Sequence, residues 1–152
     1  MPSADFEHSL LVGHSLADCW EALTDVQRVA GWVTVVGEVR ELEHLKTYRA
    51  VLEDEFGPFR LSADLDIQVT DLEPGRSISF RAKGQDRQVG TSIAVEANLA
   101  LEPAPSGTSI HVRGRWNVIG TVATMGSGAI RKKADTIFEE FFAAVANELG
   151  ST

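Results

Sequence analysis

The stretch that decides the fold is GTVATMGSGAIRKKADTIFEEFFAAVANEL, residues 120–149. Its apolar side chains recur at spacings of three and four, which predicts one long helix with an apolar stripe along one side. That stripe consists of Ile130, Ala134, Ile137, Phe138, Phe141, Val145 and Leu149. Glycines interrupt the first third of the stretch, which carries mostly small side chains, with Met125 as the bulky exception. The helix therefore either fills the core of a small domain or forms one wall of a cavity.

Strand patterns occupy the middle of the chain. The segment FRLSADLDIQVT, residues 59–70, alternates between apolar and polar side chains, which is typical of a strand with one dry and one wet face. The EPGR that follows places Pro and Gly at the centre of a turn and predicts type II geometry. Closing this hairpin sets Val69 opposite Phe80 and Asp66 opposite Lys83. In this register apolar side chains face apolar ones, and charged side chains of opposite sign face each other.

A second hairpin is predicted near the end of the chain. TSIAVEANLALE and SIHVRGRWNVI alternate in the same way and are joined by the loop PAPSG. Charge and packing favour one register, in which the facing residues are Leu101 and Ile110, Glu96 and Arg115, and Val95 and Trp116. With VVGEVREL, TYRAVLEDEF and SISFRAK, the chain has about seven strands, mostly sequence neighbours, which indicates an antiparallel meander.

The first strand, FEHSLLV, precedes the helical segment SLADCWEALTDVQRVAGW. Ser15 is placed to cap a helix whose third position is Asp18, and Asp25 offers a second cap before a short helix over residues 26–30. The fold class is therefore α+β. A curved seven-stranded antiparallel sheet surrounds a long C-terminal helix, two short helices follow the first strand, and residues 1–152 form a single domain.

Composition narrows the classes of function. The net charge of −8 argues against nucleic acid as a partner, because binding a phosphate backbone needs clustered Lys and Arg. The one cysteine and the polar, acidic start favour a cytoplasmic protein. No apolar run approaches the roughly 18 residues of a membrane span, so membrane contact is at most peripheral. The basic run at residues 131–133 is interpreted as a solvated helix face rather than a docking site.

The order strand, two short helices, six strands and long helix resembles the helix-grip fold of the START and Bet v 1-like superfamily, which includes polyketide cyclases and lipid transporters. Within it, the chain most resembles the G-subunit family of carbon monoxide dehydrogenase. The matching segments are SLADCWEALTDVQRVAGW, FGPFRLSADLDIQVTDLEPGRSISFRAKGQD and WNVIGTVATMGSGAIRKKADTIFEEFFAAV.

The resemblance implies a hydrophobic cavity between sheet and helix that binds an apolar molecule. It also implies association with subunits of a molybdenum hydroxylase of the carbon monoxide dehydrogenase type, with proposed roles in membrane attachment, maturation and lipid or quinone handling. Several members carry a tail after the long helix. Here the chain ends soon after Leu149 and is acidic, which disfavours a membrane tether.

The predicted wall of the cavity takes apolar residues from the dry faces of the strands and from the long helix. They are Trp32, Leu52, Leu61, Leu65, Phe80, Ile93, Val95, Trp116, Met125, Ile130 and Phe138. Trp116 and Trp32 suit a cavity wall or mouth as well as they suit an ordinary core. Specificity in such a site comes from shape and a few polar contacts, so the sequence does not name the ligand.

Three polar residues share the phase of inward-facing apolar neighbours. Tyr48 and Asp54 share a phase with Leu52, and His8 shares one with Phe6. Any of them could transfer a proton in a small cyclase or hydratase, because burial shifts the pKa of an acid. The interpretation we favour is that Asp54 lies in water at the end of its strand, because no partner base can be named.

Metal and phosphate chemistry find little support. The histidines, which are His8, His14, His44 and His111, show no metal-ligand spacing with one another or with Cys19, so no metal and no other cofactor is expected. The GSG at residues 126–128 lacks the Lys-Ser/Thr of a phosphate loop.

Three hypotheses about function follow. The first is a non-catalytic protein that binds a hydrophobic or amphipathic small molecule. The second is a small polyketide cyclase or hydratase that uses Tyr48, Asp54 or His8. The third is an accessory subunit whose important surface is external and includes residues 131–133. An exposed edge strand is compatible with either a monomer or a homodimer.

Overall fold

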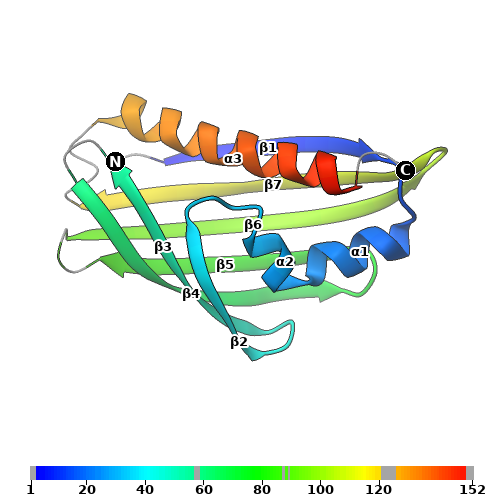
Figure 1. Cartoon of the computed structure of the whole chain (residues 1–152), viewed down its shortest axis with the longest axis horizontal. Coiled ribbons are helices and arrows are strands. Elements are labelled where there is room, and N and C mark those ends of the chain that lie inside the picture. The colour runs from blue at the N-terminus through cyan, green and yellow to red at the C-terminus, as the bar shows by residue number, and fades with distance from the viewer. Residues whose placement is uncertain (1–2, 57–58, 87, 89, 121–125, 150–152) are drawn as a thin grey trace.

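A computed structural model describes residues 3–56, 59–86, 88, 90–120 and 126–149. Its strands are β1 (Ser3–Val12), β2 (Val36–Glu43), β3 (Thr47–Phe56), β4 (Phe59–Glu73), β5 (Ser77–Asp86), β6 (Thr91–Ala104) and β7 (Gly107–Gly120). Its helices are α1 (Leu16–Thr24), α2 (Val26–Ala30) and α3 (Ser127–Leu149). The seven strands form one curved antiparallel sheet in the order β1-β7-β6-β5-β4-β3-β2, and the helices lie on one side of it (Figure 1). The predicted helix-grip architecture is confirmed.

Both predicted hairpin registers are confirmed. Val69 faces Phe80 and Asp66 faces Lys83 between β4 and β5. The three pairs predicted between β6 and β7 are also present. In the EPGR turn, Gly75 has a φ of +76°, and the Arg76 amide donates a hydrogen bond of 2.9 Å to the Glu73 carbonyl. A positive φ at this position is what the type II turn requires of its third residue.

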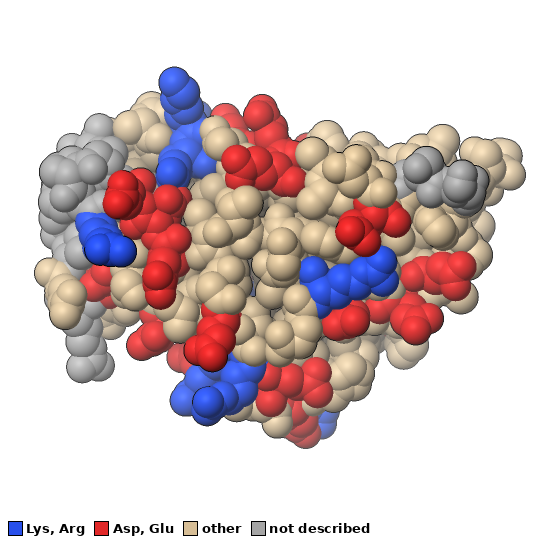
Figure 2. All heavy atoms as spheres, in the orientation of Figure 1, with Lys and Arg blue, Asp and Glu red and all other residues tan. Residues whose placement is uncertain are grey.

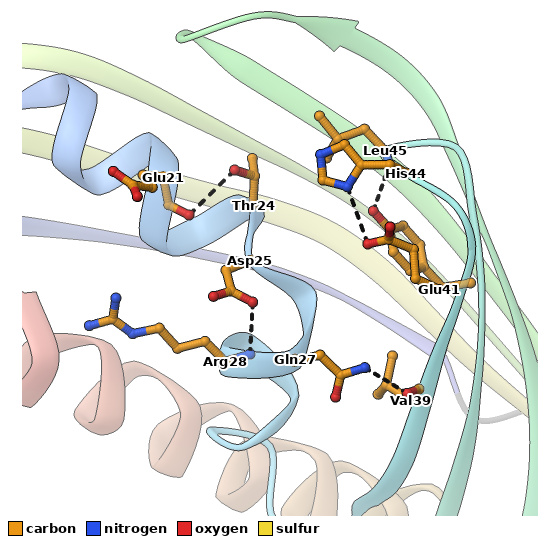
Figure 3. Close-up of polar contacts among 10 residues, drawn as sticks. Glu21, Thr24, Asp25, Gln27, Arg28, Val39, Glu41, His44 and Leu45 are labelled. Carbon is orange, nitrogen blue, oxygen red and sulfur yellow. Dashed lines mark hydrogen bonds and ion pairs between the residues drawn. The ribbon is translucent and has the colours of Figure 1, made fainter.

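Side-chain caps start the two short helices as predicted. The Ser15 hydroxyl accepts from the Asp18 amide at 3.2 Å, and an Asp25 carboxylate oxygen accepts from the Arg28 amide at 3.3 Å (Figure 3). Helix α2 then contacts β2, where the Gln27 side-chain amide donates to the Val39 carbonyl at 2.8 Å (Figure 3). These contacts attach the helical segment to the β2 edge of the sheet.

Helix α3 begins later than residue 120, which corrects the predicted boundary. Gly120 belongs to β7, where it pairs with Thr91. Residues 121–125, and with them Met125, lie outside the described residues. Gly126 has a φ of +98°, and its carbonyl accepts from the Ile130 amide at 3.3 Å. Gly126 therefore stands just before the helix, in a backbone conformation that favours glycine.

One end of the interior is a solid core. Helix α1 and the C-terminal half of α3 cover the ends of β6 and β7. The core cluster there contains Val12, Cys19, Leu23, Leu99, Leu101, Ile110, Val112, Phe142, Val145 and Leu149. The gap among its larger side chains has no room for a water molecule. The Gly13 amide donates to the Leu149 carbonyl at 3.1 Å, which fastens the end of α3 to this core.

A smaller cluster holds the N-terminal half of α3. Trp116, Val118 and Ile130 form its buried centre. Phe6 packs against them and stacks on Phe138, with ring centroids 4.3 Å apart. Phe6 lies over Gly114 of β7, where a Cβ atom would stand 2.7 Å from its ring. A glycine in the strand thus lets an aromatic ring approach the backbone and support the helix.

Candidate ligand-binding site

The dry face of the central strand keeps solvent-accessible surface. Strand β5 has a neighbour on each side, yet its dry-face residues Ile78 and Phe80 are only half-buried. The adjacent side chains of Ile67, Val69 and Val95 on β4 and β6 are half-buried as well. Because neighbouring strands cover the flanks of β5, this exposure must come from space above the dry face. Side chains therefore do not fill the interior completely here.

The arrangement of the elements accounts for this space. Helix α3 runs alongside β1 and β7, whereas β4, β5 and the first part of β3 lie away from it (Figure 1). The dry face between them carries small side chains at Ala63, Ala82 and Ala97, together with Gly84. On the face that contains α3, Figure 2 shows uncharged residues across the centre with charged residues around them. Dry-face side chains of β4–β6 remain partly accessible here, and we call the dry face of β3–β6 together with the N-terminal half of α3 the hollow end.

The predicted wall residues fall into three groups. Ile93, Val95, Trp116, Ile130 and Phe138 meet in the cluster at the N-terminal half of α3. Leu52, Leu61, Leu65 and Phe80 lie on the dry face of β3, β4 and β5. Trp32 packs instead with the solid core, with its ring centroid 6.4 Å from that of Phe141. Contact of these residues with a ligand stays a prediction.

The three polar candidates do not share a site. Tyr48 and Asp54 are six residues apart on β3, which corresponds to about 20 Å along a strand. His8 is on β1, at the other side of the sheet, and stacks on Phe142 with ring centroids 4.1 Å apart. Tyr48 has a structural partner, because its hydroxyl accepts from the Leu45 amide at 2.7 Å. Burial raises the pKa of Tyr48. These three side chains therefore form no acid–base pair.

Asp54 does not lie in water, which corrects the interpretation favoured from the sequence. Its side chain is 15% exposed, and Oδ2 is 3.1 Å from Nζ of Lys133 on α3. Its other oxygen, Oδ1, accepts from the Glu55 amide at 2.8 Å. The reason is geometric: α3 passes close to the end of β3, so a helix cation reaches the strand carboxylate. This ion pair spans the hollow end from sheet to helix.

The basic run is correspondingly not a uniform solvated face. The Lys133 side chain is 37% exposed and is paired with Asp54, while Arg131 donates to the Ser3 carbonyl at 3.3 Å. Lys133 follows Ile130 by three residues and precedes Ile137 by four, a spacing that places it on the apolar stripe. That spacing was the signal in the sequence that could have identified its inward role.

Helix α2 and the loop after it make further contacts with α3. The Thr34 hydroxyl donates to a Glu140 carboxylate oxygen at 2.8 Å. Arg28 forms a 3.1 Å ion pair with Glu148, and its guanidinium carbon lies 5.8 Å from the centroid of the Trp32 ring. Together with the Asp54–Lys133 pair, these contacts tie α3 to the β2–β3 side of the sheet at intervals along its length.

The polar outer face carries two open depressions of about 880 and 590 Å³, the first lined in part by Asp66 and Lys83 and the second by Arg81 and Arg115. His111 lies on this face, with Nδ1 hydrogen-bonded to the Ser9 hydroxyl at 2.6 Å and Nε2 3.7 Å from Glu7. A serine, a histidine and a carboxylate that contact one another in this order are typical of a hydrolase. Here they lie on the solvent side of β1 and β7, where a nucleophile stays hydrated. Among the described residues, no group of His, Cys, Asp and Glu has the geometry of a metal site.

A long helix packed against a curved seven-stranded antiparallel sheet, with two short helices after the first strand, is the helix-grip fold of START and Bet v 1-like proteins. The family model of the carbon monoxide dehydrogenase G-subunit (CoxG) matches residues 9–150, so the chain belongs to this family.

Solved structures show the same fold. A conserved protein from Geobacillus kaustophilus is 18% identical with a TM-score of 0.81, and the match covers 95% of this chain and 94% of that one. Ara h 8.0201 is 14% identical with a TM-score of 0.61, covering 95% and 99%. DynU16, from the dynemicin biosynthetic locus, is 20% identical with a TM-score of 0.55, covering 98% of this chain and 49% of its own.

No curated protein matches the chain in sequence. Within the described part of the chain, none of the helices has the length and apolar character to cross a membrane.

Proposed function

We propose that this protein binds a hydrophobic or amphipathic small molecule, a lipid, a quinone or a similar compound, at the hollow end. The observation that carries the proposal is the half-buried apolar surface on the dry face of the central strands, at Phe80 of β5 and at Ile67 and Val69 of β4. In a fully packed core, apolar side chains at such positions are shielded from solvent. A ligand with an apolar body would cover them here and remove that surface from water.

The absence of a shared acid–base site supports binding over catalysis. Tyr48, Asp54 and His8 are each engaged in a separate contact, with Leu45, Lys133 and Phe142 respectively. General acid–base catalysis needs groups within hydrogen-bond reach of one substrate atom. The proposed role is therefore to hold a molecule.

Membership of the CoxG family extends the proposal to a partner. We propose that the protein acts as an accessory protein of a molybdenum hydroxylase of the carbon monoxide dehydrogenase type, for which it holds the ligand. The proposed association is tested by size-exclusion chromatography of the purified chain mixed with the molybdenum hydroxylase from the same organism. Comigration of the two proteins is expected, and separate elution at micromolar concentrations would count against the partner while leaving ligand binding untouched.

The direct test of binding is native mass spectrometry of the purified chain, followed by solvent extraction. A discrete additional mass that disappears on extraction is the expected result. A panel of lipids and quinones added to the extracted protein should restore such a mass. A bare chain throughout would overturn the proposal.

A space-filling variant locates the site. Ile67→Trp adds a large ring on the dry face of β4, where Ile67 is half-buried. We expect the variant to fold and to bind the ligand at least about tenfold more weakly, because the indole occupies the ligand's volume. Gln68→Trp is the matched control, since Gln68 is the next residue on the same strand and faces solvent. Equal affinity in the two variants would place the ligand elsewhere.

A further inference from the structure

The side of α3 that faces away from the sheet carries exposed residues at helical spacing. They are Ala129, Lys132, Thr136, Glu139, Ala143 and Asn147, and we call them the outer stripe. Successive members are three or four residues apart, so they lie in one row along the helix, opposite the apolar stripe that packs on the sheet. Figure 2 shows basic groups over the start of α3 and acidic groups further along it.

The charges of α3 are segregated by sign along its axis. The basic run at residues 131–133 comes first, and Asp135, Glu139 and Glu140 follow. The first turn of the helix contains no acidic residue and the last turn contains no basic one, so the charges do not compensate the helix dipole. Asp135 and Glu139 are also four residues apart, a spacing at which like charges repel each other. An oppositely directed helix would meet each sign with the other.

The charges of the outer stripe are not used within the chain. Other charged groups of α3 are engaged with the sheet and with α2, as the ion pairs of Lys133 and Glu148 show. Of the ion pairs among the described residues, none includes Lys132 or Glu139. Thr136 lies between them, and its hydroxyl donates to the Lys132 carbonyl at 3.0 Å. The row therefore presents one cation and one anion that are available to a partner.

A second copy of the chain fits this row when its α3 runs antiparallel. With a twofold axis at Thr136, Ala129 of each copy faces Ala143 of the other. Lys132 is four residues before the axis and Glu139 is three residues after it, so each lysine is level with the other copy's glutamate to about 1.5 Å. Residues seven positions apart lie on the same flank of a helix, which brings the lysine and the glutamate together in two pairs per dimer.

The size and direction of the contact favour this arrangement over others. The side chains on the axis and at either end of it are small, at Thr136, Ala129 and Ala143, so the two helices can approach closely. A parallel second copy would instead set lysine beside lysine and glutamate beside glutamate, which is unfavourable.

We propose that the outer stripe is the interface through which two copies of this chain associate, with their α3 helices antiparallel. This inference goes beyond the proposed function, because the outer stripe lies on the side of α3 that is turned away from the hollow end. The contact consists mainly of one helix face, and small interfaces are typical of reversible complexes. The dimer therefore forms in a concentration-dependent equilibrium with the monomer.

The first test is sedimentation velocity of the wild-type chain at about 5 to 500 micromolar in low salt, of about 20 mM. We expect a shift from monomer to dimer across this range. Raising the salt to about 500 mM should weaken the association at least about fivefold, because exposed ion pairs are screened. A monomer at every concentration would overturn the proposal.

Charge reversals identify the surface. Lys132→Glu sets glutamate opposite glutamate, and Glu139→Lys sets lysine opposite lysine, so each variant should weaken self-association about tenfold or more. Arg131→Glu is the matched control. It changes the net charge as Lys132→Glu does, but Arg131 is directed toward β1, where it donates to the Ser3 carbonyl, so the wild-type equilibrium should remain. Circular dichroism and thermal unfolding verify that each variant is folded.

Mixing the two weakened variants separates pairing between copies from effects within one helix. In an equimolar mixture of Lys132→Glu and Glu139→Lys chains, each glutamate again faces a lysine, so a heterodimer should form about as tightly as the wild-type dimer. A role of these residues only in the stability of their own helix would give no recovery on mixing. A mixture that stays monomeric would overturn the proposal. So would single variants that dimerise like the wild type, which would place the interface elsewhere, for instance at an edge strand.

Discussion

The two ends of the interior differ although one helix runs through both. At the solid end, the C-terminal half of α3 meets large side chains, among them Leu101 and Ile110, and no water-sized space remains. At the hollow end, the same apolar stripe meets Trp116 and Val118, while Phe80 on the neighbouring strand β5 stays half-buried. The difference teaches that an apolar stripe on a helix does not by itself indicate a filled core. The distance of the helix from each strand decides that.

The largest expected effect lies at the solid end. Leu101→Ala removes a side chain that is 1% exposed within the core. We expect it to lower the free energy of unfolding by about 2–5 kcal/mol, because it leaves a cavity in tightly packed surroundings. Urea denaturation measures the change. The ligand affinity of the folded variant should stay within about twofold of the wild-type affinity, because the two positions are far apart. A stability loss under about 1 kcal/mol would show that this end is not solid.

A smaller stability effect with a larger binding effect is expected at the hollow end. Phe80→Ala removes a half-buried ring from the dry face of β5. We expect a loss of about 1–2 kcal/mol in the free energy of unfolding, less than for a fully buried Phe, because the ring is already in part accessible. Ligand affinity should fall about tenfold or more, since the ring is part of the proposed wall. If Phe80→Ala destabilised the chain as much as Leu101→Ala while binding stayed normal, the comparison would fail.

The smallest effect concerns pH. Tyr48, the one tyrosine of the chain, is buried on β3, and burial raises its pKa above the ordinary value of about 10. The folded state therefore keeps the phenol proton where the unfolded state has lost it. This contribution to stability is complete below the unfolded pKa and is lost as pH rises through the raised folded pKa.

Ultraviolet absorbance of tyrosinate follows this titration without overlap from other tyrosines. We expect a midpoint above that of the urea-unfolded chain. Tyr48→Phe should show a flatter loss of stability at alkaline pH than the wild type. Coincident midpoints in the folded and unfolded chain would mean that water reaches Tyr48 through the hollow end.

Local patterns predicted a large part of the fold. The alternation in β4 and β6 determined which face of each strand is dry, and turn chemistry with facing charges placed Asp66 opposite Lys83 and Glu96 opposite Arg115. Caps at Ser15 and Asp25 located both short helices. These predictions hold because periodicity, caps and tight turns depend only on residues that are close together in the sequence.

The sequence alone therefore determined the elements, their faces and the register of two hairpins. Only the tertiary structure decided how far α3 stands from each strand, and with it which end of the interior is solid. The Asp54–Lys133 pair depends on the same distance, because the curl of the sheet brings the end of β3 to the helix. A period assigns a side chain to a face, but it carries no information on the width of the gap that this face encloses.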